Sequence, residues 1–231
     1  MYINLNPKYI FKSLVLIIIV LLIANIFSVT TKLNYFLDYN NQDYVRVLSN
    51  LFDFDVEKSI PTMFSSFILF FSAILLGFFG IKDKNKGIKY SPWFGLSTIF
   101  IYLSVDEMME LHEHLVTAVK TIIPTSGILY YAWIIPYGIG LIILFAVYYK
   151  FLIRLPRRTL YLFILSGIIF VLGAVGIESF EGWEHELHGE RTLTYCIMYT
   201  FEEILEMLGV SLFIYSILSY SNFSIKIKTD N

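Results

Sequence analysis

Long apolar segments alternate with short polar ones along the whole chain of 231 residues. As a helix, each apolar segment can cross the hydrocarbon core of a bilayer, roughly 30 Å thick, which needs about 20 residues. The pattern therefore predicts an all-α fold, a polytopic membrane helix bundle that forms one domain over residues 1–231. Six spans are predicted, near residues 9–29, 60–81, 93–119, 127–153, 159–178 and 195–220, with an extracytoplasmic loop at 32–59.

The composition agrees with a membrane protein. Hydrophobic residues make up 57% of the chain and charged residues only 16%, a balance typical of proteins whose solvent is lipid. With six spans, twelve of the seventeen Lys and Arg residues fall on the side of the N-terminus. The positive-inside rule then predicts a multi-pass protein of the plasma (inner) membrane with both termini in the cytoplasm. Its expected surroundings are the lipid bilayer, and no nucleic-acid partner is expected.

Ionisable residues gather in three segments, DEMMELHEHL (106–115), ESFEGWEHELHGE (178–190) and FEEILEMLG (201–209). These segments hold all four histidines and twelve of the nineteen acidic residues. Each lies toward the outer end of a predicted span, so a rise of about 1.5 Å per residue brings them to the same depth in the outer half of the bilayer. Ionisable side chains inside a span are costly and usually mark a functional site.

The spacing within these segments predicts a metal site. Residues four apart on a helix are neighbours on its surface and can hold one ion together. Four Glu and two His from three helices are the ligands of a carboxylate-rich site for a divalent metal, either iron, manganese or zinc. The predicted ligands form three pairs: Glu110 with His114, Glu181 with His185, and Glu202 with Glu206. The second pair requires that the helix continue past Gly182.

Other polar residues near these pairs receive different predictions. Asp106, Glu107 and Glu203 lie on the same polar stripes and are predicted to transfer protons as catalytic carboxylates. His112 is predicted to face away from the stripe of its helix. Acidic residues after Trp183 are expected in a solvated loop, because the helix of the fifth span should end there. The small residues of SGIIFVLGAVG (166–176) are expected to let helices approach closely.

The order of several motifs adds a resemblance. The motifs are LFDFDVEKSIPTMFSS, LSVDEMMELHEHL, YAWIIPYGIG, GIESFEGWEHELHG and FEEILEMLG. In this order they resemble a family of uncharacterised, small, six-span bacterial integral membrane proteins, over most of the chain after residue 40. The resemblance implies a single compact membrane module and implies no reaction.

Three functions fit these observations. The first is a metal-dependent enzyme whose ion activates water or oxygen against a lipid or other apolar substrate that reaches the site from the bilayer. The second is a cation or proton transporter, although the inner halves of the spans carry almost no ionisable residues. The third is a sensor or structural protein whose polar cluster only fixes the packing of the helices.

Overall fold

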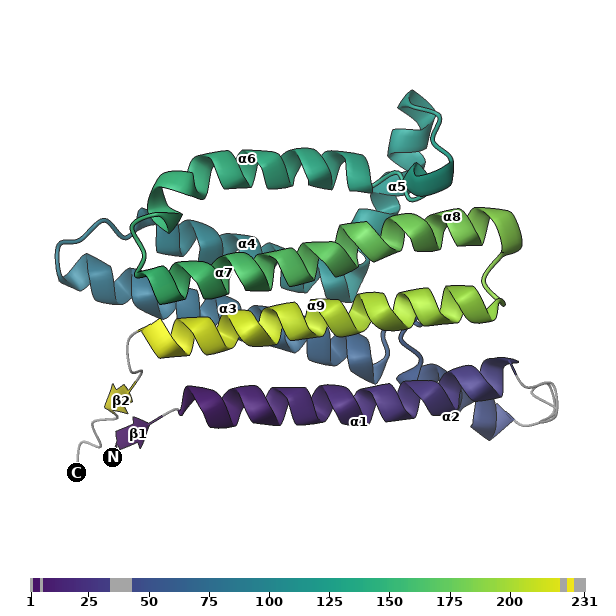
Figure 1. The fold of residues 1–231 in the computed structure, drawn as a ribbon, viewed down its shortest axis with the longest axis horizontal. Helices are drawn as coiled ribbons and strands as arrows, with labels where there is room; N and C mark the ends of the chain where they lie inside the picture. The colour runs from purple at the N-terminus through teal and green to yellow at the C-terminus, as the bar shows by residue number, and fades with distance from the viewer. Residues whose placement is uncertain (1, 5, 34–42, 221–223, 227–231) are drawn as a thin grey trace.

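The computed structural model is a bundle of helices that lie side by side along one axis (Figure 1). It describes residues 2–4, 6–33, 43–220 and 224–226. Strands β1 (Tyr2–Asn4) and β2 (Ser224–Lys226) pair antiparallel at one end of the bundle. The helices are α1 Pro7–Leu33, α2 Asp43–Phe52, α3 Ile60–Asn85, α4 Ser91–Met109, α5 Leu111–Ile122, α6 Ile134–Leu152, α7 Arg157–Val171, α8 Glu178–His188 and α9 Leu193–Tyr220. A 3-10 turn, Gly127–Leu129, precedes α6, and a π-helical segment, Leu172–Ile177, joins α7 to α8.

Four helices are long and apolar enough to cross a membrane: Pro7–Leu33, Ile60–Asn85, Ile134–Leu152 and the joined helix Arg157–His188. Helix α1 shows the pattern that a lipid solvent requires. Its Leu16 and Ile23 side chains are 62% and 63% exposed, whereas Asn25 and Ser28 are fully buried. Apolar side chains outside and polar ones inside suit a hydrocarbon solvent, in which polar groups must find their partners within the protein. The chain is therefore a membrane protein.

Three predicted spans coincide with helices, and three need correction. The ranges 9–29, 60–81 and 195–220 lie within α1, α3 and α9, which confirms them as helical. The range 93–119 is not one helix, because Glu110 adopts a left-handed backbone with φ of 55° between α4 and α5.

The next two predicted spans differ from the observed helices in where the helix begins or ends. Helix α6 begins only at Ile134, later than the range 127–153 predicts. The helix predicted over 159–178 continues to His188, so the expected end near Trp183 is wrong. The predicted loop 32–59 contains α2, and its residues 34–42 lie outside the described part of the chain.

Helices α3 and α4 form a tight pair through small polar residues. The Ser66 hydroxyl donates to the Ser104 carbonyl oxygen at 2.8 Å, and the Ser104 hydroxyl donates to the Ser66 carbonyl oxygen at 2.9 Å. Such exchanged hydrogen bonds hold membrane helices together where apolar packing gains nothing over lipid. The α4 backbone is thereby fixed up to the point where Asp106 and Glu107 follow.

Helix α9 lies at the centre and packs against α1, α3 and α7. Two glycines bring it close to the joined helix. A Cβ atom on Gly173 would lie 2.8 Å from the Glu202 carbonyl oxygen, and one on Gly209 would lie 2.8 Å from the Phe170 amide nitrogen. Within segment 166–176 the expected close approach is therefore made at Gly173, whereas a Cβ atom on Gly167 would meet nothing within 4 Å. The close approach also places the acidic residues of α8 directly beside those of α9.

Candidate functional site

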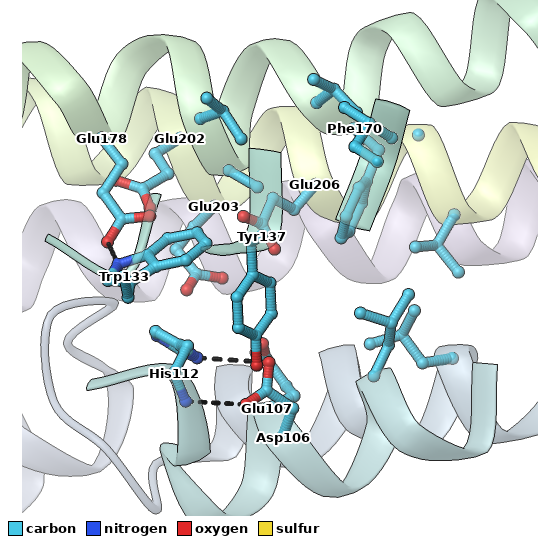
Figure 2. A pocket seen from close by; sticks show the side chains of 18 of the residues that line it. Asp106, Glu107, His112, Trp133, Tyr137, Phe170, Glu178, Glu202, Glu203 and Glu206 are labelled. Carbon is cyan, nitrogen blue, oxygen red and sulfur yellow. Dashed lines mark hydrogen bonds and ion pairs between the residues drawn. The ribbon is translucent and has the colours of Figure 1, made fainter. Parts of the chain in front are cut away.

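A cavity of ≈ 580 Å³ lies between α4, α6, the joined helix α7–α8 and α9 (Figure 2). One end of it is acidic. No Lys or Arg of the described chain is among its lining residues, and His112 is the one histidine there. Ten carboxyl side chains line it: Asp55, Glu57, Asp106, Glu107, Glu113, Glu178, Glu181, Glu202, Glu203 and Glu206. Within the lining, His112 is thus the one basic side chain that faces this group of carboxyls.

The other end of the same cavity is apolar. Its lining residues there come from α4, α6, α7 and α9 and include Leu96, Phe100, Leu144, Phe163 and Phe213. Phe213 stacks on Phe100, with ring centroids 4.6 Å apart. The cavity thus has the dimensions and the division into polar and apolar ends of a site for an amphiphilic small molecule.

The break at Glu110 shapes the α4 side of the acidic end. Asp106 accepts a hydrogen bond from the His112 backbone amide at 2.8 Å and so binds the start of α5. The His112 ring turns back toward the same carboxylate, with 3.4 Å between Nδ1 and Oδ2 (Figure 2). The prediction that His112 faces away is therefore wrong. It assumed an unbroken helix, whereas a left-handed residue changes the direction of every side chain after it.

The π-helical segment shapes the opposite side. It lies immediately before Glu178, and an inserted residue of this kind rotates the side chains that follow, often at functional sites. Glu178 accepts a hydrogen bond from the Trp133 indole at 2.8 Å. The Glu202 carboxyl from α9 is within hydrogen-bonding distance of both Glu178 and Glu181, and Figure 2 shows the Glu178 and Glu202 carboxyls facing each other.

Carboxyl groups in contact need a proton or a cation between them, because two ionised oxygens repel each other strongly in a water-poor site. Glu181 is only 6% exposed, and its Oε2 atom has no hydrogen-bond partner in the described structure. The same is true of Oε2 of Glu203. These unpartnered acceptors point to a positively charged or hydrogen-donating ligand.

The predicted site residues divide into two groups. All three predicted catalytic carboxylates, Asp106, Glu107 and Glu203, line the cavity. So do three of the six predicted metal ligands, namely Glu181, Glu202 and Glu206.

The other three predicted ligands have different partners. Glu110 lies 3.5 Å from the Lys58 ammonium group. The His114 ring bonds the Glu110 backbone carbonyl at 2.7 Å, and the His185 ring bonds the Tyr131 hydroxyl at 2.9 Å. Within the described residues, no group of three or more His, Cys, Asp or Glu side chains is arranged to hold a metal ion.

Sequence reasoning missed several lining residues. Glu178 was detectable, since it lies one helical turn before Glu181 and only the assumed end of the helix separated the two. His112 and Glu113 could not be placed without knowing the break at Glu110. Asp55 and Glu57 reach the cavity from the segment after α2, whose folding depends on contacts between distant parts of the chain.

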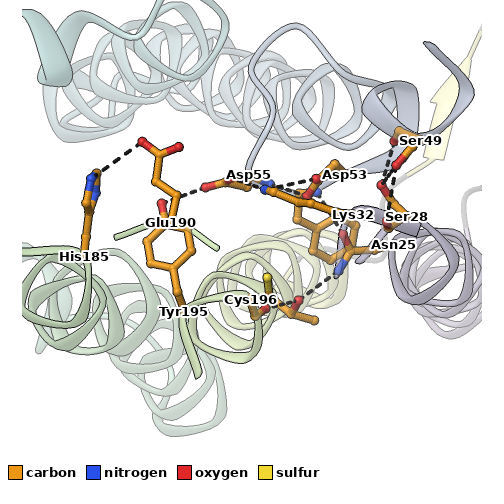
Figure 3. A network of polar contacts seen from close by, with 12 residues as sticks. Asn25, Ser28, Lys32, Ser49, Asp53, Asp55, His185, Glu190, Tyr195 and Cys196 are labelled. Atoms are coloured by element: carbon orange, nitrogen blue, oxygen red, sulfur yellow. Dashed lines mark hydrogen bonds and ion pairs between the residues drawn. The ribbon is translucent and has the colours of Figure 1, made fainter. Parts of the chain in front are cut away.

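Those contacts form a polar network at the end of the bundle away from β1 and β2 (Figure 1 and Figure 3). Lys32 at the end of α1 lies 2.6 Å from Asp55 and 3.3 Å from Asp53. Asp55 also accepts a hydrogen bond from the Tyr195 hydroxyl of α9 at 2.7 Å. Asn25 accepts a hydrogen bond from the Phe54 amide at 2.9 Å. The segment 53–57 is therefore fixed to α1 and α9, and it covers the acidic end of the cavity.

Comparison with protein families matches residues 14–220 to a family described as Domain of unknown function (DUF8692). No curated protein and no solved structure matches the chain.

Glu57 lies on the segment between α2 and α3, and its carboxyl allows the electrostatic environment at the acidic end of the cavity to be tested. Burial, together with the nearby Glu110 and Glu113, raises the pKa of the Glu57 carboxyl from 4.5 to about 7. In that pH interval the folded protein holds a proton that the unfolded chain releases, so the free energy of unfolding falls as pH rises from 4.5 to about 7. Glu57→Gln removes this titration and should flatten the decline.

The measurement is thermal unfolding in mild detergent over this pH range. Glu57→Gln should unfold at a higher temperature than the wild type above about pH 7, where the wild-type carboxylate is ionised. Glu190→Gln is the control. The Glu190 side chain is 61% exposed, so water screens its ion pair with His185, at 3.6 Å, and the variant should give the wild-type pH profile. A Glu57→Gln profile that follows the wild type at every pH would contradict the assignment.

Proposed function

Because the chain belongs to this family of unknown function, we propose its activity from the cavity: it is a membrane enzyme that holds a divalent metal ion among its carboxylates and acts on a lipid or other apolar substrate. The observation that carries the proposal is the contact of Glu202 with Glu178 and Glu181 in a lining without Lys or Arg. A divalent ion between these carboxyls would replace repulsion by attraction.

With no histidine among the ligands, carboxylate oxygens favour a hard ion, and of the three metals predicted from the sequence manganese fits best. Glu178, Glu181 and Glu202 would hold the ion, and Glu206 lies one helical turn below Glu202 on the same lining. The proposal thus keeps two of the ligands predicted from the sequence, Glu181 and Glu202, and adds Glu178. Within the described residues no three such side chains are arranged to hold an ion as they stand, so binding would require the contacting glutamates to change rotamer and turn their oxygens toward the ion.

The remaining carboxylates supply proton transfer. Glu107 and Glu203 line the cavity from facing helices, and Asp106 is held by His112. A bound metal ion lowers the pKa of its water and so provides a nucleophile at neutral pH. A neighbouring carboxylate can then pass the proton to a leaving group. The apolar end of the cavity would hold the hydrocarbon part of the substrate and keep bulk water away.

Two other functions agree less well with the described geometry. Transport of a cation or proton would need polar groups that continue toward the other face, but the far wall consists of side chains such as Leu96, Phe163 and Phe213. A polar network that only fixes the packing of the helices would give each of its buried polar atoms a hydrogen-bond partner. The unpartnered oxygens of Glu181 and Glu203 argue against that role.

We further propose six spans, with α4 and α9 added to the four apolar helices, and both termini in the cytoplasm of a cell bounded by its plasma membrane. Support comes from the length of α9, 28 residues, and from the uneven distribution of basic residues. In this arrangement the end of the bundle that carries β1 and β2 is cytoplasmic, and α5 is outside (Figure 1).

The topology can be measured with single cysteines in a Cys196→Ser background. Asn85 and Thr121 are both exposed, at opposite ends of the bundle. An impermeant thiol reagent applied to intact cells should label a cysteine at position 121 and spare one at position 85. The reverse labelling would show that the proposed orientation is inverted, and labelling of both would refute the six spans.

The metal is tested by elemental analysis of protein purified in mild detergent. The wild type should retain a divalent metal ion. Glu202→Gln keeps the size of the side chain but removes an anionic ligand, and it should weaken binding by at least about tenfold, since even changes behind the ligands cost that much. Glu190→Gln serves as the matched control, because its exposed side chain lies outside the cavity lining, and it should retain the wild-type metal content. Wild-type protein without metal, or full metal in Glu202→Gln, would overturn the proposal.

A further inference from the structure

Helix α6 is attached to the bundle mainly at its two ends. At the outer end, Trp133 bonds Glu178, and the Tyr137 and Tyr102 hydroxyls lie 2.7 Å apart. At the other end, the Phe151 ring lies 4.9 Å from the Trp93 ring. Ile134 is the one buried residue among the nineteen of α6. The middle of the helix therefore packs loosely against its neighbours and leaves a gap beside α7. Helix α6 lies at the edge of the bundle (Figure 1).

Two glycines lie on either side of this gap. Gly140 on α6 and Gly167 on α7 both line the cavity, and a Cβ atom on either would meet nothing within 4 Å. The side chains around them that face outward are apolar and exposed: Ile139, Ile143, Ile164 and Ile168. Because these isoleucines face the region that lipid chains would occupy, the gap between α6 and α7 opens the cavity sideways into the membrane.

The charge of the acidic end restricts which headgroups of an amphiphile can bind there. Ten carboxyls without a Lys or Arg in the lining repel phosphate and carboxylate headgroups, even with one divalent ion bound. Aromatic rings stand among the carboxyls, with the Trp133 and Tyr137 centroids 4.9 Å apart. Carboxylates combined with aromatic faces are the surroundings that bind ammonium groups.

We propose that the substrate is a single-chain amphiphile with an amine headgroup, which enters from the bilayer between α6 and α7 and places its amine in the acidic end. As the identity of a substrate, this inference rests on the proposed function. The volume of ≈ 580 Å³ falls within the range of sites that hold one small molecule. The hydrocarbon chain would lie along the apolar wall, beside Phe100 and Phe213, and remain in contact with the gap.

The test is saturable binding of radiolabelled tetradecylamine to the full chain in phosphatidylcholine nanodiscs, with empty nanodiscs as the background. Tetradecyl phosphate and tetradecanol have the same chain length and serve as competitors. We expect saturable amine binding, weaker competition by the alcohol, and no competition by the phosphate. Competition by the phosphate equal to that of unlabelled amine, or the absence of saturable amine binding, would overturn the inference.

Tryptophan substitutions test the path. Gly140→Trp and Gly167→Trp should fill the gap from its two sides, and each should weaken amine binding by at least about tenfold, which corresponds to about 1.4 kcal/mol. Gly138→Trp is the matched control. Gly138 lies on the same helix with equally open surroundings, but it is not among the cavity-lining residues, so this variant should bind as the wild type does. Equal binding by all three variants would refute the path.

Metal analysis of the same nanodiscs separates this inference from the proposed function. Retained metal in Gly140→Trp shows that the variant is folded, so its loss of amine binding can be assigned to the blocked gap. Metal without saturable amine binding in the wild type would refute the amine substrate and leave the metal proposal standing. Amine binding that Gly140→Trp blocks, in a protein without metal, would support the amphiphile site and refute the metal.

Discussion

The structure depends on one constraint: carboxyl groups placed in a water-poor cavity within a membrane protein must be neutralised. A single uncompensated carboxylate in such surroundings costs several kcal/mol. Here Glu202 contacts two other carboxyls, and the lining of their cavity contains no Lys or Arg. Protons can neutralise this cluster in the absence of a ligand. A bound cation can neutralise the cluster with a more specific geometry than protons can. A preference of the carboxyls for a cation over protons would make the cavity a binding site.

Irregular backbone puts the carboxyls into this position. The left-handed Glu110 ends α4 and turns His112 back onto Asp106. The π-helical segment precedes Glu178, and Gly173 brings the joined helix against α9. At the end of the bundle away from β1 and β2, Lys32 and Tyr195 fix Asp55 over the cavity. Each feature departs from regular helix or ordinary spacing, and each lies next to an acidic side chain. Departures of this kind are retained where function compensates for them.

The apolar pattern was sufficient to predict α1, α3 and α9, because hydrophobic runs of span length have few alternatives in a membrane. It did not predict the break at Glu110, the late start of α6 or the extension of the fifth span to His188. It also placed acidic residues of three helices at one depth, and Glu107 of α4, Glu181 of α8 and Glu202 of α9 line the same cavity. The directions in which side chains point within the site were harder to predict. A rotation of about 100° per residue holds only in an unbroken α-helix. It failed for His112, which follows the break at Glu110, and it gave no indication that His185 would bond Tyr131. The partnership of Lys32 with Asp55 joins two segments whose approach depends on the folded bundle.

Calorimetric titration with manganese(II) in two buffers of different ionisation enthalpy tests the central claim most directly, because it counts the protons released when an ion binds. If protons and a cation compete for the same carboxyls, the wild type should release at least about one proton for each ion bound. A Glu178→Gln, Glu202→Gln double variant should lose both the binding heat and the release. Saturable binding without proton release, or no binding heat in the wild type, would contradict the account.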